Sequence, residues 1–198
     1  MSAAYRQERP VSPKGLPSMK ITSLAFAALA VAVLATPGLA TRALAAAPQP
    51  AKPIAATFFT GRWYEIARTE NARQRGCEAT TYDFQPQKSG GQTDFVLSCR
   101  KGSPTGKLES SNASVRVPTD AARNKFRVSL LGGAIKQEYW VLDRADDLSW
   151  AIMATPGGNY VWILARKPNL DKGLKTQLMT RVKAMGYDAS KIVQPRHG

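Results

Sequence analysis

Short runs of strand-forming residues, each followed by a turn, occupy the sequence between residues 63 and 166. They are rich in Val, Ile, Thr and aromatic residues, and Gly, Pro and Asp separate them. The runs cover residues 63–69, 77–84, 93–100, 106–117, 124–131, 137–143, 148–154 and 159–166. No interval is long enough for a crossover. The pattern therefore predicts an all-β, eight-stranded antiparallel up-and-down β-barrel able to hold one small ligand. A two-sheet sandwich is the alternative, which the regular hairpin spacing disfavours.

A helical pattern replaces the strand pattern after residue 168. Asp171 suits the N-cap position of a helix, and Gly186 suits the position just after its end. Between them, apolar residues recur at the spacing of one helix face: Leu174, Leu178, Val182 and Met185. We therefore predict one C-terminal α-helix packed on the outside of the barrel, followed by a short ninth strand at 191–194.

Residues 1–45 have the layout of a secretory signal peptide with an N-terminal extension, so that translation starts at Met1 or Met19. An apolar run at 21–35 precedes Ala43-Leu44-Ala45, which resembles a cleavage site. The run is shorter than the about 20 residues of a transmembrane helix, although an uncleaved anchor is the alternative. No cysteine for lipid attachment stands nearby. We expect a periplasmic protein, with secretion or membrane association as alternatives, in which residues 46–56 form a flexible linker and residues 57–198 the barrel domain.

The chain has 2 cysteines, Cys77 and Cys99. They flank a turn region, and an antiparallel hairpin centred at residue 88 would place them opposite each other. Disulfides persist outside the cytoplasm, and a bridge here would contribute roughly 3 kcal/mol by restricting the unfolded chain. We therefore predict a disulfide between them; two separate buried thiols are the alternative.

The sequence is strongly basic, with a formal net charge of +14. Such a charge suggests nucleic acid or an anionic membrane as a partner. The basic residues are scattered along the chain, and no basic helix or nucleic-acid-binding module is recognisable. We therefore expect a generally solvated cationic surface, no nucleic-acid partner, and at most peripheral contact with an anionic membrane.

Three segments of the barrel region resemble motifs of the lipocalin family. They are Gly61-Arg62-Trp63-Tyr64-Glu65-Ile66-Ala67-Arg68; Tyr139-Trp140-Val141-Leu142-Asp143 running into Leu148-Ser149-Trp150-Ala151; and Tyr160-Val161-Trp162-Ile163-Leu164-Ala165-Arg166. The resemblance covers residues 57–195, and it is to the branch of the bacterial outer-membrane lipocalins and apolipoprotein D. It implies a ligand-binding barrel with one external helix.

The resemblance also implies roles for individual residues. In lipocalins, a tryptophan of the first strand closes the barrel floor and an arginine of the last barrel strand packs across it. Trp63, which follows the turn residue Gly61, and Arg166 match these positions, and a guanidinium stacks well on an indole face. Tyr82 and Trp162 match the pocket tyrosine and tryptophan of apolipoprotein D, which implies that both contact the ligand.

Strand alternation adds candidates for the cavity lining, because residues two apart point to the same side of a sheet. In the strands 159–166 and 124–131, one face carries apolar and aromatic side chains: Tyr160, Trp162 and Leu164 in the first, Phe126, Val128 and Leu130 in the second. In the first strand, the same alternation would turn Glu65 inward with Trp63 and Ala67. A buried carboxylate needs a partner, which the sequence does not identify.

No catalytic or metal-binding set is recognisable. The single histidine, His197, stands next to the C-terminus, which argues against a buried Ser–His triad or a histidine metal site. We therefore expect a non-enzymatic monomer or dimer, without cofactor or metal, that carries a hydrophobic or amphipathic ligand. By resemblance, the ligand would be a fatty acid or lysophospholipid, for lipid transport or envelope maintenance. The alternatives are a lipid-modifying enzyme on the same barrel and an envelope interaction protein with a filled barrel.

Overall fold

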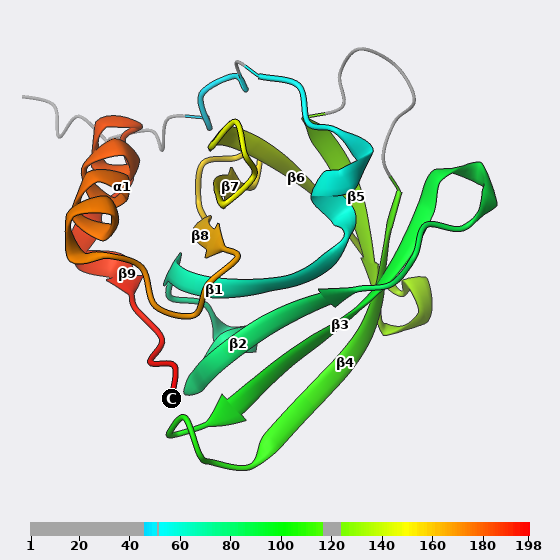
Figure 1. Ribbon diagram of the computed structural model, residues 1–198, viewed down its shortest axis with the longest axis horizontal. Helices are drawn as coiled ribbons and strands as arrows, with labels where there is room; N and C mark the ends of the chain where they lie inside the picture. Colours follow the sequence, from blue (N-terminus) through cyan, green and yellow to red (C-terminus); the bar gives the residue numbers. More distant parts are fainter. Residues whose placement is uncertain (1–45, 51, 117–123) are drawn as a thin grey trace, which may run out of the picture. The chain divides into compact units, whose positions relative to one another are not determined.

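The computed structural model describes residues 46–50, 52–116 and 124–198, so the predicted signal peptide lies outside the described residues. The barrel strands are β1 (Gly61–Thr69), β2 (Cys77–Phe84), β3 (Gln92–Lys101), β4 (Leu108–Arg116), β5 (Lys125–Leu130), β6 (Ile135–Arg144), β7 (Trp150–Ala154) and β8 (Val161–Ala165). Each pairs antiparallel with the next, and β1 pairs with both β2 and β8 (Figure 1). This closure confirms the predicted barrel and excludes the two-sheet sandwich.

Strand β1 pairs with β8 along one edge, and with two different strands, β2 and then the short strand β9 (Ile192–Val193), along the other edge. Tyr64 pairs with Thr81 of β2 on one edge and with Ala165 of β8 on the other. Further along, β9 takes the place of β2, so that Arg68 pairs with Val193. The C-terminal segment thereby covers backbone groups of β1 that would otherwise form an open sheet edge.

A β-bulge in β1 changes which side chains face the barrel interior. The register of β1 against β8 shifts between Glu65 and Ala67, which leaves Ile66 as the additional residue. Ile66 and Ala67 consequently pack in the apolar cluster beneath the helix, while Glu65 and Arg68 form a buried ion pair. The expected inward orientation of Ala67 is wrong, because simple alternation does not account for the bulge.

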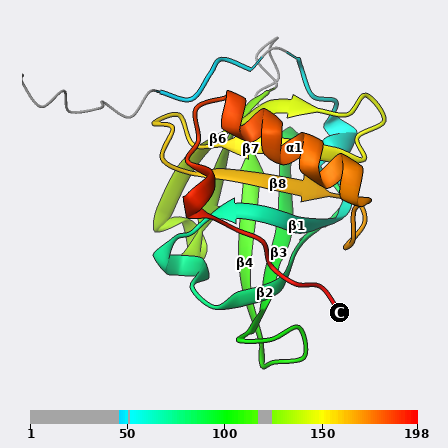
Figure 2. The same ribbon diagram turned by 90° about the vertical axis from the view of Figure 1, so that its left-hand side faces the viewer.

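The helix α1 (Lys172–Ala184) begins and ends where the sequence predicts. The side chain of Asp171 accepts hydrogen bonds from the N–H groups of Gly173 and Leu174, at 2.8 and 3.2 Å. Gly186 has a φ of +94°, which suits glycine in the left-handed region. Figure 2 shows α1 lying over β7 and β8 on the outside of the barrel. Among the described residues, no helix is long and apolar enough to cross a membrane.

The apolar side chains form two clusters, one on each side of the barrel wall. The outer cluster joins the buried face of α1, which includes Leu178 and Val182, to outward-facing residues such as Ile163 of β8. The inner cluster occupies the barrel and includes Trp63 and Phe126. The two clusters follow from strand alternation, since successive residues of β8 contribute to opposite sides.

Described residues before β1 pack against the barrel, beginning with Ala47. The N–H of Ala47 donates to the carbonyl oxygen of Pro156 at 3.0 Å, and the Arg144 guanidinium donates to the Pro53 carbonyl. Ile54 is 2% exposed and belongs to the inner cluster. Parts of the stretch that we expected to be a linker therefore contribute to the folded domain, which extends N-terminally beyond residue 57.

Candidate functional site

The barrel encloses an apolar cavity of about 290 Å³. All the residues that the sequence predicts as ligand contacts line it: Tyr82, Phe126, Val128, Leu130, Tyr160, Trp162 and Leu164. They come from β2, β5 and β8 and from the loop before β8. The structure thus brings the predicted residues together around one space, and their contact with a ligand remains a prediction.

Further aromatic residues complete the cavity lining. Phe59 lies in the 3₁₀ helix η1 (Ala56–Phe59), and its ring centre is 4.9 Å from that of Phe126. Tyr139 of β6 stacks on Phe126, with 5.8 Å between ring centres, and contacts Trp162 at 5.4 Å. Strand alternation could have identified Tyr139. No sequence signal marked Phe59, because it precedes the first strand.

The floor of the barrel has the tryptophan–arginine contact that the resemblance implies. Trp63 is fully buried, and the Arg166 guanidinium carbon lies 3.8 Å from the centre of its ring. Arg166 also donates to the carbonyl oxygen of Thr60 at 2.6 Å, and the Trp63 indole N–H donates to that of Phe58 at 2.9 Å. Partial burial lowers the pKa of Arg166. Gly61 has a φ of +60°, which permits the sharp entry into β1.

A buried polar network lies behind the cavity wall and supplies the missing partners of Glu65. This carboxylate accepts hydrogen bonds from Arg68 at 2.6 Å, from the Gln74 amide at 2.7 Å and from the Tyr82 hydroxyl at 2.7 Å. The Trp162 indole N–H in turn donates to the Gln74 side-chain oxygen at 3.1 Å. The network therefore fixes the orientation of two predicted ligand contacts, Tyr82 and Trp162.

Tyr82 and Tyr139, which line the cavity, are held in their neutral form. Burial is the largest of the effects that raise the pKa of Tyr82 well above its ordinary value. The negative charge of Glu65 and the hydrogen bond that its carboxylate accepts from Tyr82 raise this pKa further. Burial also raises the pKa of Tyr139, and the positive charge of Arg73 partly offsets this effect. Both hydroxyls consequently remain protonated at neutral pH.

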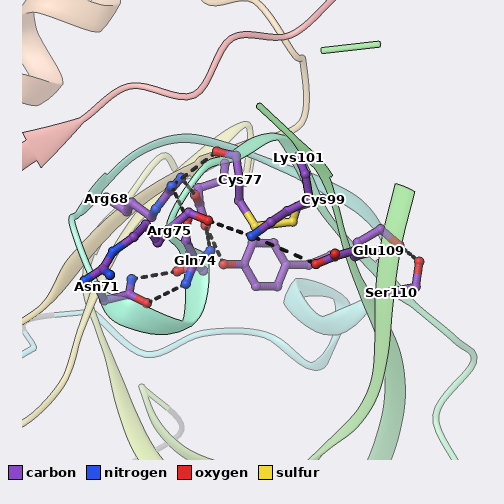
Figure 3. The surroundings of a disulfide bond; sticks show 12 residues. Arg68, Asn71, Gln74, Arg75, Cys77, Cys99, Lys101, Glu109 and Ser110 are labelled. Carbon is purple, nitrogen blue, oxygen red and sulfur yellow. Dashed lines mark hydrogen bonds and ion pairs between the residues drawn. A yellow bond between two sulfur atoms is a disulfide. The ribbon is translucent and has the colours of Figure 1, made fainter. Parts of the chain in front are cut away.

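The Cys77–Cys99 disulfide confirms the predicted pairing. The two Cα atoms are 5.3 Å apart, but Cys77 stands opposite Lys101 in the β2–β3 ladder, so the cysteines are diagonal rather than direct neighbours. Figure 3 shows the bridge next to Arg68 and Gln74. The Arg68 guanidinium donates to the Cys77 carbonyl oxygen at 3.2 Å, which connects the bridge to the buried network.

The polar end of the cavity is formed partly by the 3₁₀ helix η2 (Ala72–Gln74), and Arg73 is the charged side chain among the lining residues. Arg73 is exposed to solvent. The Thr155 hydroxyl is buried at the same cavity and has no hydrogen-bond partner within the described part of the chain. The cavity thus combines an apolar interior with a cation and neutral polar groups at one end.

Within residues 46–50, 52–116 and 124–198, no cluster of three His, Cys, Asp or Glu side chains is arranged to hold a metal ion. The ring Nε2 of His197 lies 2.8 Å from the Glu65 carbonyl oxygen, and the ring packs edge-on against Tyr64. His197 is therefore in contact with β1 and is not among the cavity-lining residues.

A closed eight-stranded barrel with an apolar cavity, a tryptophan–arginine floor and one external helix defines a class of proteins that enclose small molecules. Residues 54–197 match the family model of the Lipocalin-like domain, and the chain belongs to this lipocalin family. Lipocalins bind small hydrophobic ligands and are generally binding and transport proteins, which agrees with the cavity described above.

Relatives of known name are similar over most of the barrel. Outer membrane lipoprotein Blc of Vibrio cholerae is 24% identical over 151 residues, which cover 74% of this chain and 86% of the relative. Outer membrane lipoprotein Blc of Escherichia coli K12 is 26% identical over 68% of this chain and 75% of its own length. Temperature-induced lipocalin-1 of Arabidopsis thaliana is 27% identical over 68% of this chain and 74% of its own length. These similarities support the bacterial lipocalin assignment.

Solved structures show the same fold at lower sequence identity. Insecticyanin of the tobacco hornworm Manduca sexta matches with a TM-score of 0.59 and 19% identity, covering 76% of this chain and 84% of the other. The cockroach allergen Per a 4 matches with a TM-score of 0.58 and 13% identity, covering 76% and 93%. At these identities, the comparison establishes the barrel fold alone.

Proposed function

We propose that this protein binds and carries a single-chain hydrophobic or amphipathic molecule, such as a fatty acid or lysophospholipid, in its barrel cavity. The observation that carries the proposal is an apolar, aromatic-lined cavity with one charged side chain, Arg73, in its lining. The acyl chain would occupy the interior, and an anionic head group would lie near Arg73. The proposal includes no catalytic step, because none of the described lining residues is His, Cys, Asp, Glu or Lys.

The size and lining of the cavity support a ligand with one acyl chain. Its volume of about 290 Å³ lies at the lower end of small-molecule pockets, which argues against a two-chain lipid. Each buried CH₂ group contributes about 0.8 kcal/mol, so a long chain would reach micromolar affinity after the cost of association. Affinity should therefore rise with chain length.

The names of the relatives support a role in the cell envelope. Two of them are outer membrane lipoproteins, and we propose that this protein is exported by its signal peptide to the periplasm. There it would transport lipids or help to maintain the envelope, as a monomer or dimer.

Titration of purified protein with saturated fatty acids of increasing length, followed by tryptophan fluorescence, tests the proposal. We expect Trp162→Ala to weaken binding without unfolding the barrel, because Trp162 lines the cavity. Trp150→Ala is the matched control, since Trp150 packs in the outer cluster. Arg73→Gln should weaken binding of the anionic chain, whereas Arg75→Gln, a control on the same loop, should not.

Two results would overturn the carrier proposal. The first is that no chain length changes the fluorescence and no lipid copurifies with the protein, which would indicate a barrel filled by its own side chains. The second is equal weakening by Trp162→Ala and Trp150→Ala, which would indicate binding outside the cavity.

A further inference from the structure

A second depression, of about 610 Å³, lies on the outer surface of the wall formed by β3, β4, β5 and β6. We call it the outer basic groove and define it by its charged lining residues Arg116, Lys125, Arg127, Lys136 and Glu138. The groove has four cations and one carboxylate. Phe126 also borders the groove, but its side chain is only 3% exposed and packs in the inner cluster. The groove therefore presents charge without an apolar anchor.

Strand register brings these cations together. Arg116 of β4 stands directly opposite Arg127 of β5, which stands opposite Glu138 of β6. Two residues further along β5, Ser129 stands opposite Lys136 of β6. Directly opposed like charges destabilise a strand pair, so an anion that bridges the two arginines would relieve their repulsion.

The charged side chains of the groove form no ion pairs with one another within the described part of the chain. None of the ion pairs among the described residues includes Arg116, Arg127 or Lys136. Glu138 instead accepts a hydrogen bond from the Trp140 indole N–H. Lys125 lies 4.1 Å from the centre of the Trp140 ring. Two guanidinium groups and one ammonium group of the groove therefore have no carboxylate partner among the described residues.

We propose that the outer basic groove is a docking surface for the phosphate groups of an anionic phospholipid bilayer. A guanidinium binds phosphate through two parallel hydrogen bonds, which suits the Arg116–Arg127 pair. Stable protein interfaces need buried apolar anchors, and single-stranded nucleic acid needs exposed aromatic rings for stacking. The exposed large apolar residues of the described chain, Leu108, Leu131 and Tyr160, do not line the groove, so the phosphate surface fits best.

Strands β4 and β5, which contribute Arg116 and Arg127 to the groove, lie on the side of the barrel opposite to α1 (Figure 1). The cations of the groove point away from the cavity, because Phe126 and Val128 on the same strand line the interior. Bilayer contact would consequently be electrostatic and peripheral, and it does not depend on which molecule the cavity holds.

Cosedimentation with vesicles of phosphatidylglycerol and phosphatidylcholine, with pure phosphatidylcholine vesicles as the neutral control, tests the proposal. Each cation near an anionic bilayer strengthens partitioning by about fivefold, so Arg116→Gln/Arg127→Gln should weaken it by roughly 25-fold. Lys172→Gln/Lys183→Gln removes the same charge from the exposed face of α1 and should retain nearly wild-type partitioning. Added salt should weaken wild-type binding, because it screens exposed charges.

A thermal melt verifies that each variant is folded. Lys136→Gln alone, expected to weaken partitioning by about fivefold, tests the groove if the double variant does not fold. Equal losses in the groove and helix variants would overturn the proposal, since they would reflect net charge only. Loss of duplex DNA binding in the groove variant, without any vesicle binding by the wild type, would identify nucleic acid as the partner instead.

Discussion

Removing the cation from the buried Glu65–Arg68 pair should destabilise the barrel strongly. Glu65 is 0% exposed and Arg68 4% exposed, and their side chains are 2.6 Å apart. Arg68→Met preserves most of the side-chain volume while it leaves the carboxylate with only its hydrogen bonds from Gln74 and Tyr82. An unpaired buried charge is expensive, because the interior does not replace the lost hydration.

The expected loss for Arg68→Met is about 3–5 kcal/mol of the free energy of unfolding. Part of this loss arises at the carbonyl oxygens of Gln74 and Cys77, which accept from the same guanidinium at 2.7 and 3.2 Å and would lose that partner. For a domain of this size, the change corresponds to a decrease of roughly 6–20 °C in Tm.

Urea denaturation at pH 7, followed by tryptophan fluorescence, measures the effect. Glu65→Gln/Arg68→Met removes both charges and should recover about half or more of the loss, since a neutral amide replaces the unpaired carboxylate. A loss below about 1 kcal/mol for Arg68→Met, or a double variant as unstable as the sum of the single variants, would refute the reasoning. Arg181→Met, at an exposed ion pair with Asp143, is the matched control and should cost less than about 1 kcal/mol.

Two further predictions concern the disulfide and the barrel floor. The oxidised protein should show no titratable thiol after denaturation without reductant, and reduction of Cys77–Cys99 should lower the free energy of unfolding by roughly 3 kcal/mol. Two reactive thiols in that assay would contradict the bridge. Trp63→Ala should cost roughly 3–5 kcal/mol in urea denaturation, and its effect should not add to that of Arg166→Ala, because the two side chains are in contact. Strictly additive losses would show that they do not interact.

Local patterns in the sequence were sufficient to predict much of the barrel. Alternation in β5 and β8 identified Phe126 and Trp162 as inward-facing, and both line the cavity. Asp171 and Gly186 marked the ends of α1, because capping depends on residues within one helical turn. These features depend on interactions between residues that are near in sequence or on a strand period of two.

Other features depend on irregularities that no period reveals. The bulge at Ile66 turns Ala67 outward and allows Arg68 to meet Glu65. Likewise, Cys77 pairs with Lys101 in the β2–β3 ladder, whereas a hairpin centred at residue 88 would pair it with Cys99. A shift of one residue moves every later side chain to the other face of the sheet, so a single unpredicted bulge changes the partners of the residues that follow.

The sequence by itself therefore determined the class of the fold, the two floor residues and the apolar character of the interior. Only the tertiary structure decided that Phe59, from before the first strand, contacts Phe126, and that Gln74 and Tyr82 complete the hydrogen bonds of Glu65. The pairing of strands around the barrel is the physical reason. It juxtaposes residues far apart in the chain through strand register, so basic residues that look scattered in the sequence meet in the outer basic groove.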